Sequence, residues 1–215
     1  MTLAACQSEQ SASKNTPQAK TTTETAPQLQ QGPVILALGD SLTEGLGVPR
    51  DQNYPAQLQA LLKDEGYGHY RVTNAGLSGE TSNGLKNRLN WVLKSKPAIT
   101  ILTIGGNDAM RGLPIDLTEK NVQTIIETVQ ASGSQIVLGG MQIYENLGAE
   151  YVQEFQNIFP RLAEKYDIPM IPFFLQGVAG VPELNNSDLI HPNAKGYAHI
   201  VKHNIYPALK PYLQD

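Results

Sequence analysis

The stretch that decides the fold is Val34-Ile35-Leu36-Ala37-Leu38-Gly39-Asp40-Ser41-Leu42, in which five consecutive apolar residues are followed by a glycine and two polar residues. A continuous apolar run is typical of a strand that is buried on both faces, as in parallel sheets covered by helices. The sequence therefore predicts a strand over 34–38. It places Ser41 just beyond the end of that strand, where open α/β sheets hold their sites.

The same pattern continues downstream, where apolar runs alternate with segments in which apolar residues recur at helical spacing. Further strands are predicted at 70–74, 99–104, 135–138 and 169–172, and helices at 54–63, 82–93, 118–131, 149–166 and 193–209. The prolines around the last strand favour a position at the edge of the sheet. This alternation predicts an α/β fold with three layers, α/β/α, around a parallel sheet of about five strands.

Length and composition limit the classes of protein that fit. The chain has 215 residues, enough for one ordinary α/β domain. It contains no apolar run of about 18 residues, and its net charge of −4 with scattered lysines and arginines argues against nucleic acid as a partner. Cys6 is the only cysteine, and the four histidines lack metal-ligand spacing. We therefore expect neither a disulfide within the chain nor a metal site.

Ser41 is the candidate nucleophile because it directly follows the first predicted strand. A serine hydroxyl needs a neighbouring base to act as a nucleophile. The alternative is that Ser41 caps a short helix. Thr43 occupies the place of the second glycine in the Gly-x-Ser-x-Gly elbow of α/β-hydrolases, so that fold is disfavoured.

The candidate base lies in Asp188-Leu189-Ile190-His191-Pro192, near the C-terminus. Asp188 and His191 are three positions apart, so one loop can supply both a carboxylate and an imidazole. In this arrangement Asp188 orients the His191 ring and stabilises its charged form. Pro192 disfavours helix at His191. The alternative is an aspartate that caps the following helix beside an exposed histidine.

Two further segments could donate hydrogen bonds to an oxyanion. Asn107 follows a predicted buried strand and two glycines, and its amide suits an oxyanion hole. Taken alone, Gly105-Gly106-Asn107-Asp108 is better explained as a simple turn. Gly79 follows the second predicted strand and precedes a helix, where backbone N–H groups are free to bind an anion. Taken alone, the Gly79 segment is only a loop.

Together these segments resemble the SGNH, or GDSL-type, hydrolase family, and the likeness runs in order from about Val34 to Leu213. The matching blocks are Gly39-Asp40-Ser41-Leu42, Gly79, Gly105-Gly106-Asn107-Asp108, and Asp188 with His191-Pro192. Within the family, other stretches are similar to the bacterial thioesterase I/protease I/lysophospholipase L1 enzymes: residues 74–82 and 105–112, Met141-Gln142-Ile143 and Pro172-Phe173-Phe174.

The resemblance implies a flavodoxin-like sheet and hydrolysis of small-molecule acyl esters and thioesters through an acyl-serine intermediate, without metal or cofactor. It implies Ser41 as nucleophile, His191 as base and Asp188 as the residue that orients it. The oxyanion donors would be the backbone N–H groups of Ser41 and Gly79 and the side chain of Asn107. Two alternatives remain: a polysaccharide O-deacetylase on the same fold, and a catalytically silent, flavodoxin-like binding lipoprotein.

Apolar residues near these segments are candidates for the site of the acyl chain. They follow Asn107 or the fourth predicted strand, and they are Met110, Leu113, Pro114, Ile115 and Ile143. Apolar side chains in a loop could instead simply cover the core. The sequence leaves both interpretations open.

The N-terminal segment carries a separate signal. Leu3-Ala4-Ala5-Cys6 resembles the lipobox of bacterial lipoproteins, in which the cysteine becomes lipidated. Residues 7–32 are rich in polar residues, alanine and proline, which predicts a flexible tether. A secretory signal has a basic start and about 7–15 apolar residues, and Met1-Thr2-Leu3 supplies neither. We expect a lipobox-like start and disordered tether over 1–32 and a hydrolase domain over 33–215. We also expect a lipid anchor at Cys6 that holds the protein to the periplasmic side of a membrane of the bacterial cell envelope.

Overall fold

A parallel sheet of five strands forms the middle layer of the computed structural model, which describes Thr2, residues 32–144 and residues 147–214. The strands are β1 (Val34–Gly39), β2 (Arg71–Gly76), β3 (Ile99–Thr103), β4 (Gln135–Gly139) and β5 (Met170–Ile171). Their order is β2-β1-β3-β4-β5 and every neighbouring pair is parallel. This is the flavodoxin-like order, so the predicted fold class is confirmed, with β5 at an edge.

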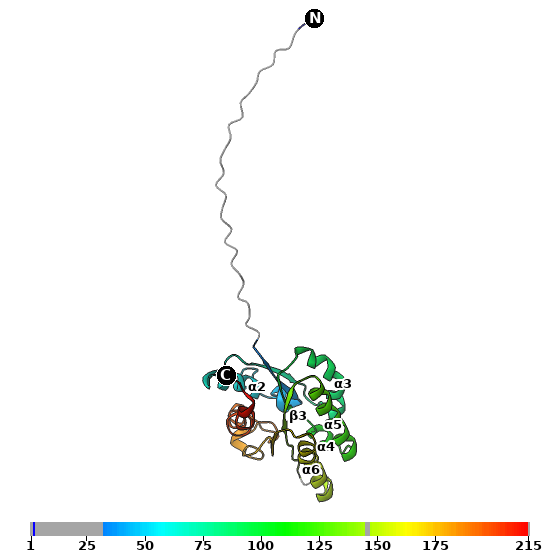
Figure 1. The fold of residues 1–215 in the computed structure, drawn as a ribbon. Helices are drawn as coiled ribbons and strands as arrows, with labels where there is room; N and C mark the ends of the chain where they lie inside the picture. The colour runs from blue at the N-terminus through cyan, green and yellow to red at the C-terminus, as the bar shows by residue number, and fades with distance from the viewer. Residues whose placement is uncertain (1, 3–31, 145–146, 215) are drawn as a thin grey trace. The chain divides into compact units, whose positions relative to one another are not determined.

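Helices cover both faces of the sheet (Figure 1). On one face lie α2 (Tyr54–Asp64) and the C-terminal helices, and on the other lie α3 (Ser82–Val92), α5 (Ile115–Ala131) and α6 (Ala149–Tyr166). Helix α6 continues through the exposed Pro160 without a break, as the predicted helix over 149–166 does. The central strands β1 and β3 are buried along their whole length, as their mainly apolar sequences predict.

The C-terminal helix differs in detail from its prediction as one helix over 193–209. It consists of α7 (Ala194–Ile200), a π-helical turn η4 (Val201–Ile205) and α8 (Tyr206–Leu209). Pro207 lacks the N–H that an α-helix needs for its bond to the residue four positions back, so the α-helical ladder is interrupted near this point. Short 3₁₀ turns also occur, at η1 (Leu93–Ser95), η3 (Pro182–Leu184) and η5 (Lys210–Tyr212).

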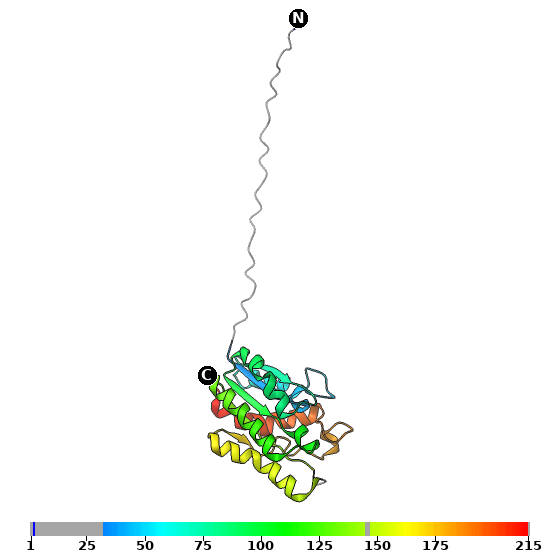
Figure 2. The same ribbon diagram turned by 90° about the vertical axis from the view of Figure 1, so that its right-hand side faces the viewer.

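Two short helices begin directly where central strands end. Helix α1 (Ser41–Glu44) follows β1, and α4 (Gly106–Met110) follows β3. In Figure 2 the segment before α7, in orange, lies at the end of the sheet where β1 ends. The doubly wound topology therefore brings three distant segments to one edge.

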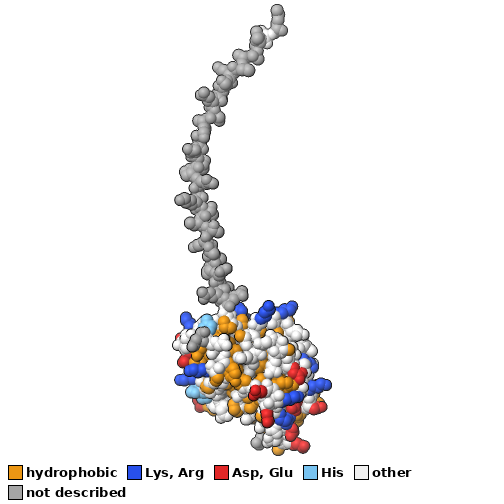
Figure 3. Space-filling view, in the orientation of Figure 1, with side chains coloured by type: hydrophobic (Ala, Val, Ile, Leu, Met, Phe, Trp, Pro, Cys, Tyr) orange, Lys and Arg blue, Asp and Glu red, His pale blue; other side chains and the backbone are white. Residues whose placement is uncertain are grey.

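On the face shown in Figure 3, lysines and arginines are interspersed with acidic and apolar side chains. Among the described residues, no helix has the length and apolar character needed to cross a membrane. The predicted lipidation site Cys6 and residues 7–31 of the predicted tether lie outside the described residues.

Candidate active site

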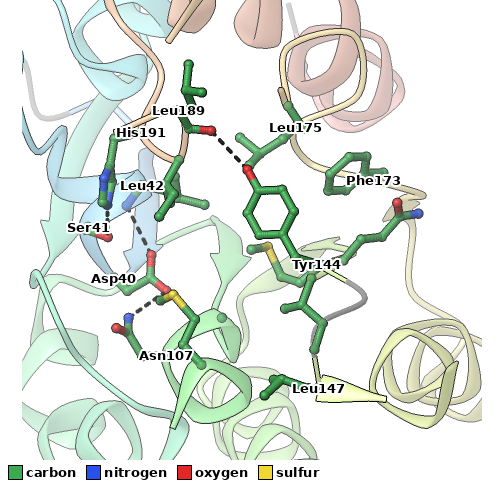
Figure 4. A pocket seen from close by; sticks show the side chains of 17 residues that line it. Asp40, Ser41, Leu42, Asn107, Tyr144, Leu147, Phe173, Leu175, Leu189 and His191 are labelled. Atoms are coloured by element: carbon green, nitrogen blue, oxygen red, sulfur yellow. Dashed lines mark hydrogen bonds between the residues drawn. The ribbon is translucent and has the colours of Figure 1, made fainter. Parts of the chain in front are cut away.

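Ser41, His191 and Asp188 form a continuous chain of contacts at this edge. Ser41 Oγ lies 2.9 Å from His191 Nε2, and His191 Nδ1 lies 2.7 Å from Asp188 Oδ2. The structure thus brings together the predicted nucleophile, base and orienting carboxylate, although 150 positions separate Ser41 from His191. Figure 4 shows Ser41 facing the ring of His191.

The loop that carries Asp188 and His191 is held by its own hydrogen bonds. Asp188 Oδ1 accepts from the backbone N–H groups of Ile190 and His191, both at 3.0 Å. Leu189 adopts a left-handed backbone with φ of 57°, which turns the chain tightly between Asp188 and Ile190. Asn193, not Asp188, caps α7, because its side chain accepts from two N–H groups of that helix. The alternative interpretation of Asp188 as a helix cap is therefore wrong.

The charge state of Asp188 follows from these contacts. Burial raises its pKa, but the hydrogen bonds from the His191 N–H, the His191 ring and the Ile190 N–H, with the charge of His191, outweigh burial and lower the pKa to about 2. Asp188 is therefore ionised at neutral pH. A carboxylate in this position fixes the imidazole ring and stabilises its charged form.

Ser41 is the first residue of α1, and its side chain is free to face His191 because Asp40 caps the helix. The Asp40 side chain accepts from the N–H of Leu42, and Gly45 ends the helix with φ of 91°. The alternative interpretation of Ser41 as the cap is therefore wrong. Burial of Ser41, with 8% of its surface exposed, keeps the hydroxyl largely away from bulk water.

Asn107 lies in the first turn of α4, with 9% of its surface exposed. Gly105 permits the abrupt change from β3 to this helix because its φ of 110° is unfavourable for other residues. The Gly105–Asp108 segment thus forms the start of a helix rather than a simple turn. Asn107 Nδ2 donates to Asp40 Oδ2 over 3.3 Å, which places the amide beside the residue that precedes Ser41.

Gly79 lies in the loop between β2 and α3, with φ of 76°. Arg111, which follows α4, donates from Nη2 to the Gly79 carbonyl oxygen over 2.7 Å. The N–H of Leu77 donates to the carbonyl oxygen of Gly39, at the end of β1. These bonds attach the Gly79 loop to both segments that carry Ser41 and Asn107.

Buried polar contacts hold the supporting loops in place. Asp108 accepts from the backbone N–H of Ser82 over 2.8 Å and from its hydroxyl over 2.5 Å. Arg88 pairs with the buried carboxylate of Glu80 over 2.6 Å and donates to the carbonyl oxygen of Ala75 over 2.8 Å. The starts of α3 and α4 are therefore bound to each other and to the end of the sheet.

Asp40 is the functional candidate that sequence reasoning missed. It is 3% exposed and lies between Ser41 and the amide of Asn107. Burial raises its pKa to about 6, against the opposing effects of the Leu42 N–H, the charge of His191 and the Asn107 amide. The available signal was a carboxylate directly before the nucleophile and after a buried strand.

A pocket of about 430 Å³ opens beside these residues (Figure 4). Most of its lining is apolar, and its polar side chains include Ser41, Asn107 and His191. The lining residues are Asp40, Ser41, Leu42, Gly106, Asn107, Met110, Met141, Gln142, Ile143, Tyr144, Leu147, Phe173, Leu175, Ala179, Leu189, Ile190 and His191. In the described parts of the chain, no cluster of three or more histidine, cysteine or acidic side chains is arranged to hold a metal ion.

The pocket contains only part of the predicted acyl-chain site. Met110 and Ile143 line it, whereas Leu113, Pro114 and Ile115 do not. Gly112 has a left-handed backbone with φ of 62°, and the Leu113 carbonyl oxygen accepts a hydrogen bond from Tyr151. Ile115 starts α5 and packs against the hydrophobic core. The structure thus places Met110 and Ile143 in the pocket lining, whereas the predicted role of Leu113, Pro114 and Ile115 has no support from this pocket.

Comparisons with known proteins agree with this geometry. Residues 37–199 match the model of the GDSL-like Lipase/Acylhydrolase family. Esterase TesA of Pseudomonas aeruginosa is 37% identical over 180 residues, which cover 83% of this chain and 89% of the relative. The thioesterase 1/protease 1/lysophospholipase L1 of Escherichia coli is 35% identical over 160 residues, covering 74% of this chain and 75% of the relative.

Two solved structures extend the likeness to three dimensions. The crystal structure of TesA superposes with a TM-score of 0.79 at 36% identity, covering 84% of this chain and 99% of that chain. AlinE4, an SGNH-hydrolase family esterase, superposes with a TM-score of 0.70 at 41% identity, covering 86% and 98%. The chain is thus a member of the GDSL-like lipase/acylhydrolase family.

Proposed function

We propose that this protein hydrolyses acyl esters and thioesters through an acyl-serine intermediate on Ser41. The observation that carries the proposal is the contact chain from Ser41 through His191 to Asp188, placed at one end of a mainly apolar pocket. The esterase and thioesterase names of the relatives support the same reaction class.

The geometry supports a two-step reaction. His191 Nε2 takes the Ser41 hydroxyl proton as Oγ forms a bond to the substrate carbonyl carbon. The carbonyl electron pair moves to oxygen, and the N–H groups of Ser41 and Gly79 and the Asn107 amide would donate hydrogen bonds to that oxyanion. The bond to the leaving alkoxide or thiolate then breaks, and the leaving group receives the proton from His191.

Hydrolysis of the acyl-serine repeats this sequence with water. His191 takes a proton from the water as its oxygen attacks the acyl carbon, and returns that proton to Ser41 Oγ as the ester bond breaks. Asp188 stays ionised throughout and stabilises the charged imidazole in each step. No step requires a metal or an organic cofactor.

The pocket favours a fatty acyl group over the two alternatives left open by the sequence. Ile143, Phe173 and Leu175 line a surface suited to methylene groups, and a polysaccharide would need more polar partners. The second alternative is a silent, flavodoxin-like protein that uses the loop after β1 to bind phosphate or flavin. It would give Asp188 and His191 no role, although His191 contacts Ser41 and Asp188 contacts His191.

Replacement of the nucleophile tests the proposal. Ser41→Ala should lower kcat on p-nitrophenyl butyrate by about 10³-fold or more, because no acyl-enzyme forms. A fluorophosphonate probe should label the wild-type protein at Ser41 and leave the variant unlabelled. Activity within tenfold of wild type in a folded variant would reject the assignment. A panel of p-nitrophenyl esters and acyl-CoA thioesters from C2 to C16 would define the acyl preference.

We further propose that the enzyme acts at the periplasmic side of a bacterial cell-envelope membrane, anchored through lipidated Cys6. Support comes from Leu3-Ala4-Ala5-Cys6 and the polar composition of residues 7–32. Mass spectrometry of protein expressed from its own gene should find a diacylglyceryl group on Cys6 in the membrane fraction. An unmodified thiol there, or protein recovered wholly in the soluble fraction, would reject this anchor.

A further inference from the structure

Asp40 is a buried carboxylate that contacts α1, which carries Ser41, and α4, which carries Asn107. Its Oδ1 accepts from the Leu42 N–H over 3.1 Å and its Oδ2 accepts from Asn107 Nδ2 over 3.3 Å (Figure 4). Asp40, Ser41 and Asn107 line the same pocket. The mechanism proposed above uses Ser41 and Asn107 and gives Asp40 no task.

The contact fixes which end of the Asn107 amide faces Asp40. An ionised carboxylate only accepts hydrogen bonds, so it attracts the amide nitrogen and repels the amide oxygen. The nitrogen carries two hydrogens. One bonds to Asp40, and the other is left for an oxygen bound in the pocket that Asn107 lines.

We propose that Asp40 is a positioning residue, which turns the Asn107 amide so that its second N–H meets the oxyanion. This inference rests on the proposed function, in which Asn107 is an oxyanion donor. Apart from its contact to Leu42, which caps α1, Asp40 acts through Asn107. Preorganised donors of this kind are effective because they need no reorientation when charge develops on the substrate.

The surroundings of Asp40 keep this carboxylate sensitive to mild acid. His191 faces it from the loop before α7, Tyr54 from α2 and Tyr197 from α7, and Asn107 reaches it from α4. Burial raises the pKa of Asp40 to about 6. It is therefore ionised at neutral pH, whereas below pH 6 it gains a proton that can donate to the amide oxygen and turn Asn107 the other way.

Asparagine cannot replace Asp40, although it has the same shape. Both carboxylate oxygens are used, one by Leu42 and one by Asn107, and an asparagine offers only one acceptor. If the side-chain oxygen in Asp40→Asn keeps the fixed backbone contact to Leu42, the new NH₂ group faces Asn107. The Asn107 amide must then turn its oxygen toward residue 40 and its nitrogen elsewhere.

A double-mutant cycle on p-nitrophenyl butyrate tests this coupling. Asn107→Ala should lower kcat by about 10²–10³-fold, and Asp40→Asn by at least about tenfold with KM within about threefold of wild type. The double variant should stay within about threefold of Asn107→Ala, because Asp40 has nothing left to position. Multiplied effects in the double variant, or Asp40→Asn activity near wild type, would overturn the proposal.

A pH profile provides a second test in which Asp40 is unchanged. Between pH 7 and pH 5, log kcat of wild type should fall more steeply than log kcat of Asn107→Ala, since only the wild type loses the oriented amide when Asp40 gains a proton. Parallel profiles would contradict the role of Asp40. Ser41→Ala separates the two proposals: if it stays active, the proposed function fails, and if it is inactive while the cycle is multiplicative, only the role of Asp40 fails.

Discussion

Arg111 Nη2 donates a hydrogen bond to the Gly79 carbonyl oxygen over 2.7 Å, and this bond joins the loop before α3 to the end of α4. Each of these segments carries one proposed oxyanion donor, Gly79 in the first and Asn107 in the second. The bond lies at the protein surface, since Arg111 is exposed. Its contribution is therefore expected in the spacing of the two donors more than in the stability of the fold.

Arg111→Ala should accordingly lower kcat by about 3- to 30-fold while changing the free energy of unfolding by less than about 1 kcal/mol. KM for a short ester should remain within about threefold, because Arg111 does not line the pocket. Arg161→Ala is the matched control, since Arg161 is an exposed arginine paired with Glu119 on the surface. Equal kcat values for both variants would show that the Arg111 contact has no catalytic consequence.

The fold could be predicted from sequence because the buried strands β1 and β3 are mainly apolar and alternate with segments of helical spacing. The contacts among Ser41, Asp188 and His191 depend on topology, which places the ends of separate segments together. The position of Leu113 outside the pocket lining could not be predicted, because apolar character alone does not reveal the left-handed backbone at Gly112. Asp40 was overlooked because its importance lies in its burial and its bond to Asn107, and neither can be read from an aspartate in a loop.

Met110 and Leu113 provide a direct test of this corrected pocket. Met110 lines the pocket and Leu113 does not, although both are apolar residues that follow Asn107. Each CH₂ group removed from water is worth about 0.8 kcal/mol, so Met110→Ala should reduce the preference for C8 over C2 esters by about 3- to 10-fold in kcat/KM. Leu113→Ala should leave that ratio unchanged. A larger change in the ratio for Leu113→Ala would restore the original prediction.

Tyr144 is bonded to the loop that carries His191, the proposed base. Its hydroxyl donates to the Leu189 carbonyl oxygen over 3.2 Å, and both residues line the pocket (Figure 4). We expect a longer acyl chain to occupy the space across which this bond is made. Because a hydrogen bond contributes about 0.5–1.5 kcal/mol, Tyr144→Phe should raise kcat/KM for C16 relative to C4 esters by about 2- to 10-fold.

Tyr151→Phe is the control for that substitution. Tyr151 also donates its hydroxyl to a backbone carbonyl, that of Leu113 over 2.7 Å, but it lies outside the pocket lining. Its chain-length profile should match the wild type. If Tyr144→Phe and Tyr151→Phe give the same C16 to C4 ratio, the bridge to Leu189 does not limit the acyl chain.

The buried carboxylate of Asp40 should also lower the free energy of unfolding, by an amount that depends on pH. Its pKa is about 6 in the folded protein against an ordinary value of 3.8, so between these values the folded state binds more protons than the unfolded state. Stability contributed by this group therefore rises as the pH falls from 7 toward 4. A shift of about two pKa units corresponds to roughly 3 kcal/mol at neutral pH, as an upper figure.

Asp40→Asn removes that buried charge and should raise the free energy of unfolding at pH 7.5 by up to about 3 kcal/mol, even as it lowers kcat. The gain should shrink to about 1 kcal/mol near pH 4.5, where the wild-type carboxyl is mostly protonated in the folded state. Urea denaturation at both pH values measures it. Asp51→Asn, at an exposed position, should change the unfolding free energy by less than about 0.5 kcal/mol at either pH. Two results would contradict the prediction: a lower free energy of unfolding for Asp40→Asn at pH 7.5, or an increase of equal size at both pH values. Either would mean that burial of the ionised Asp40 carboxylate does not destabilise the folded enzyme.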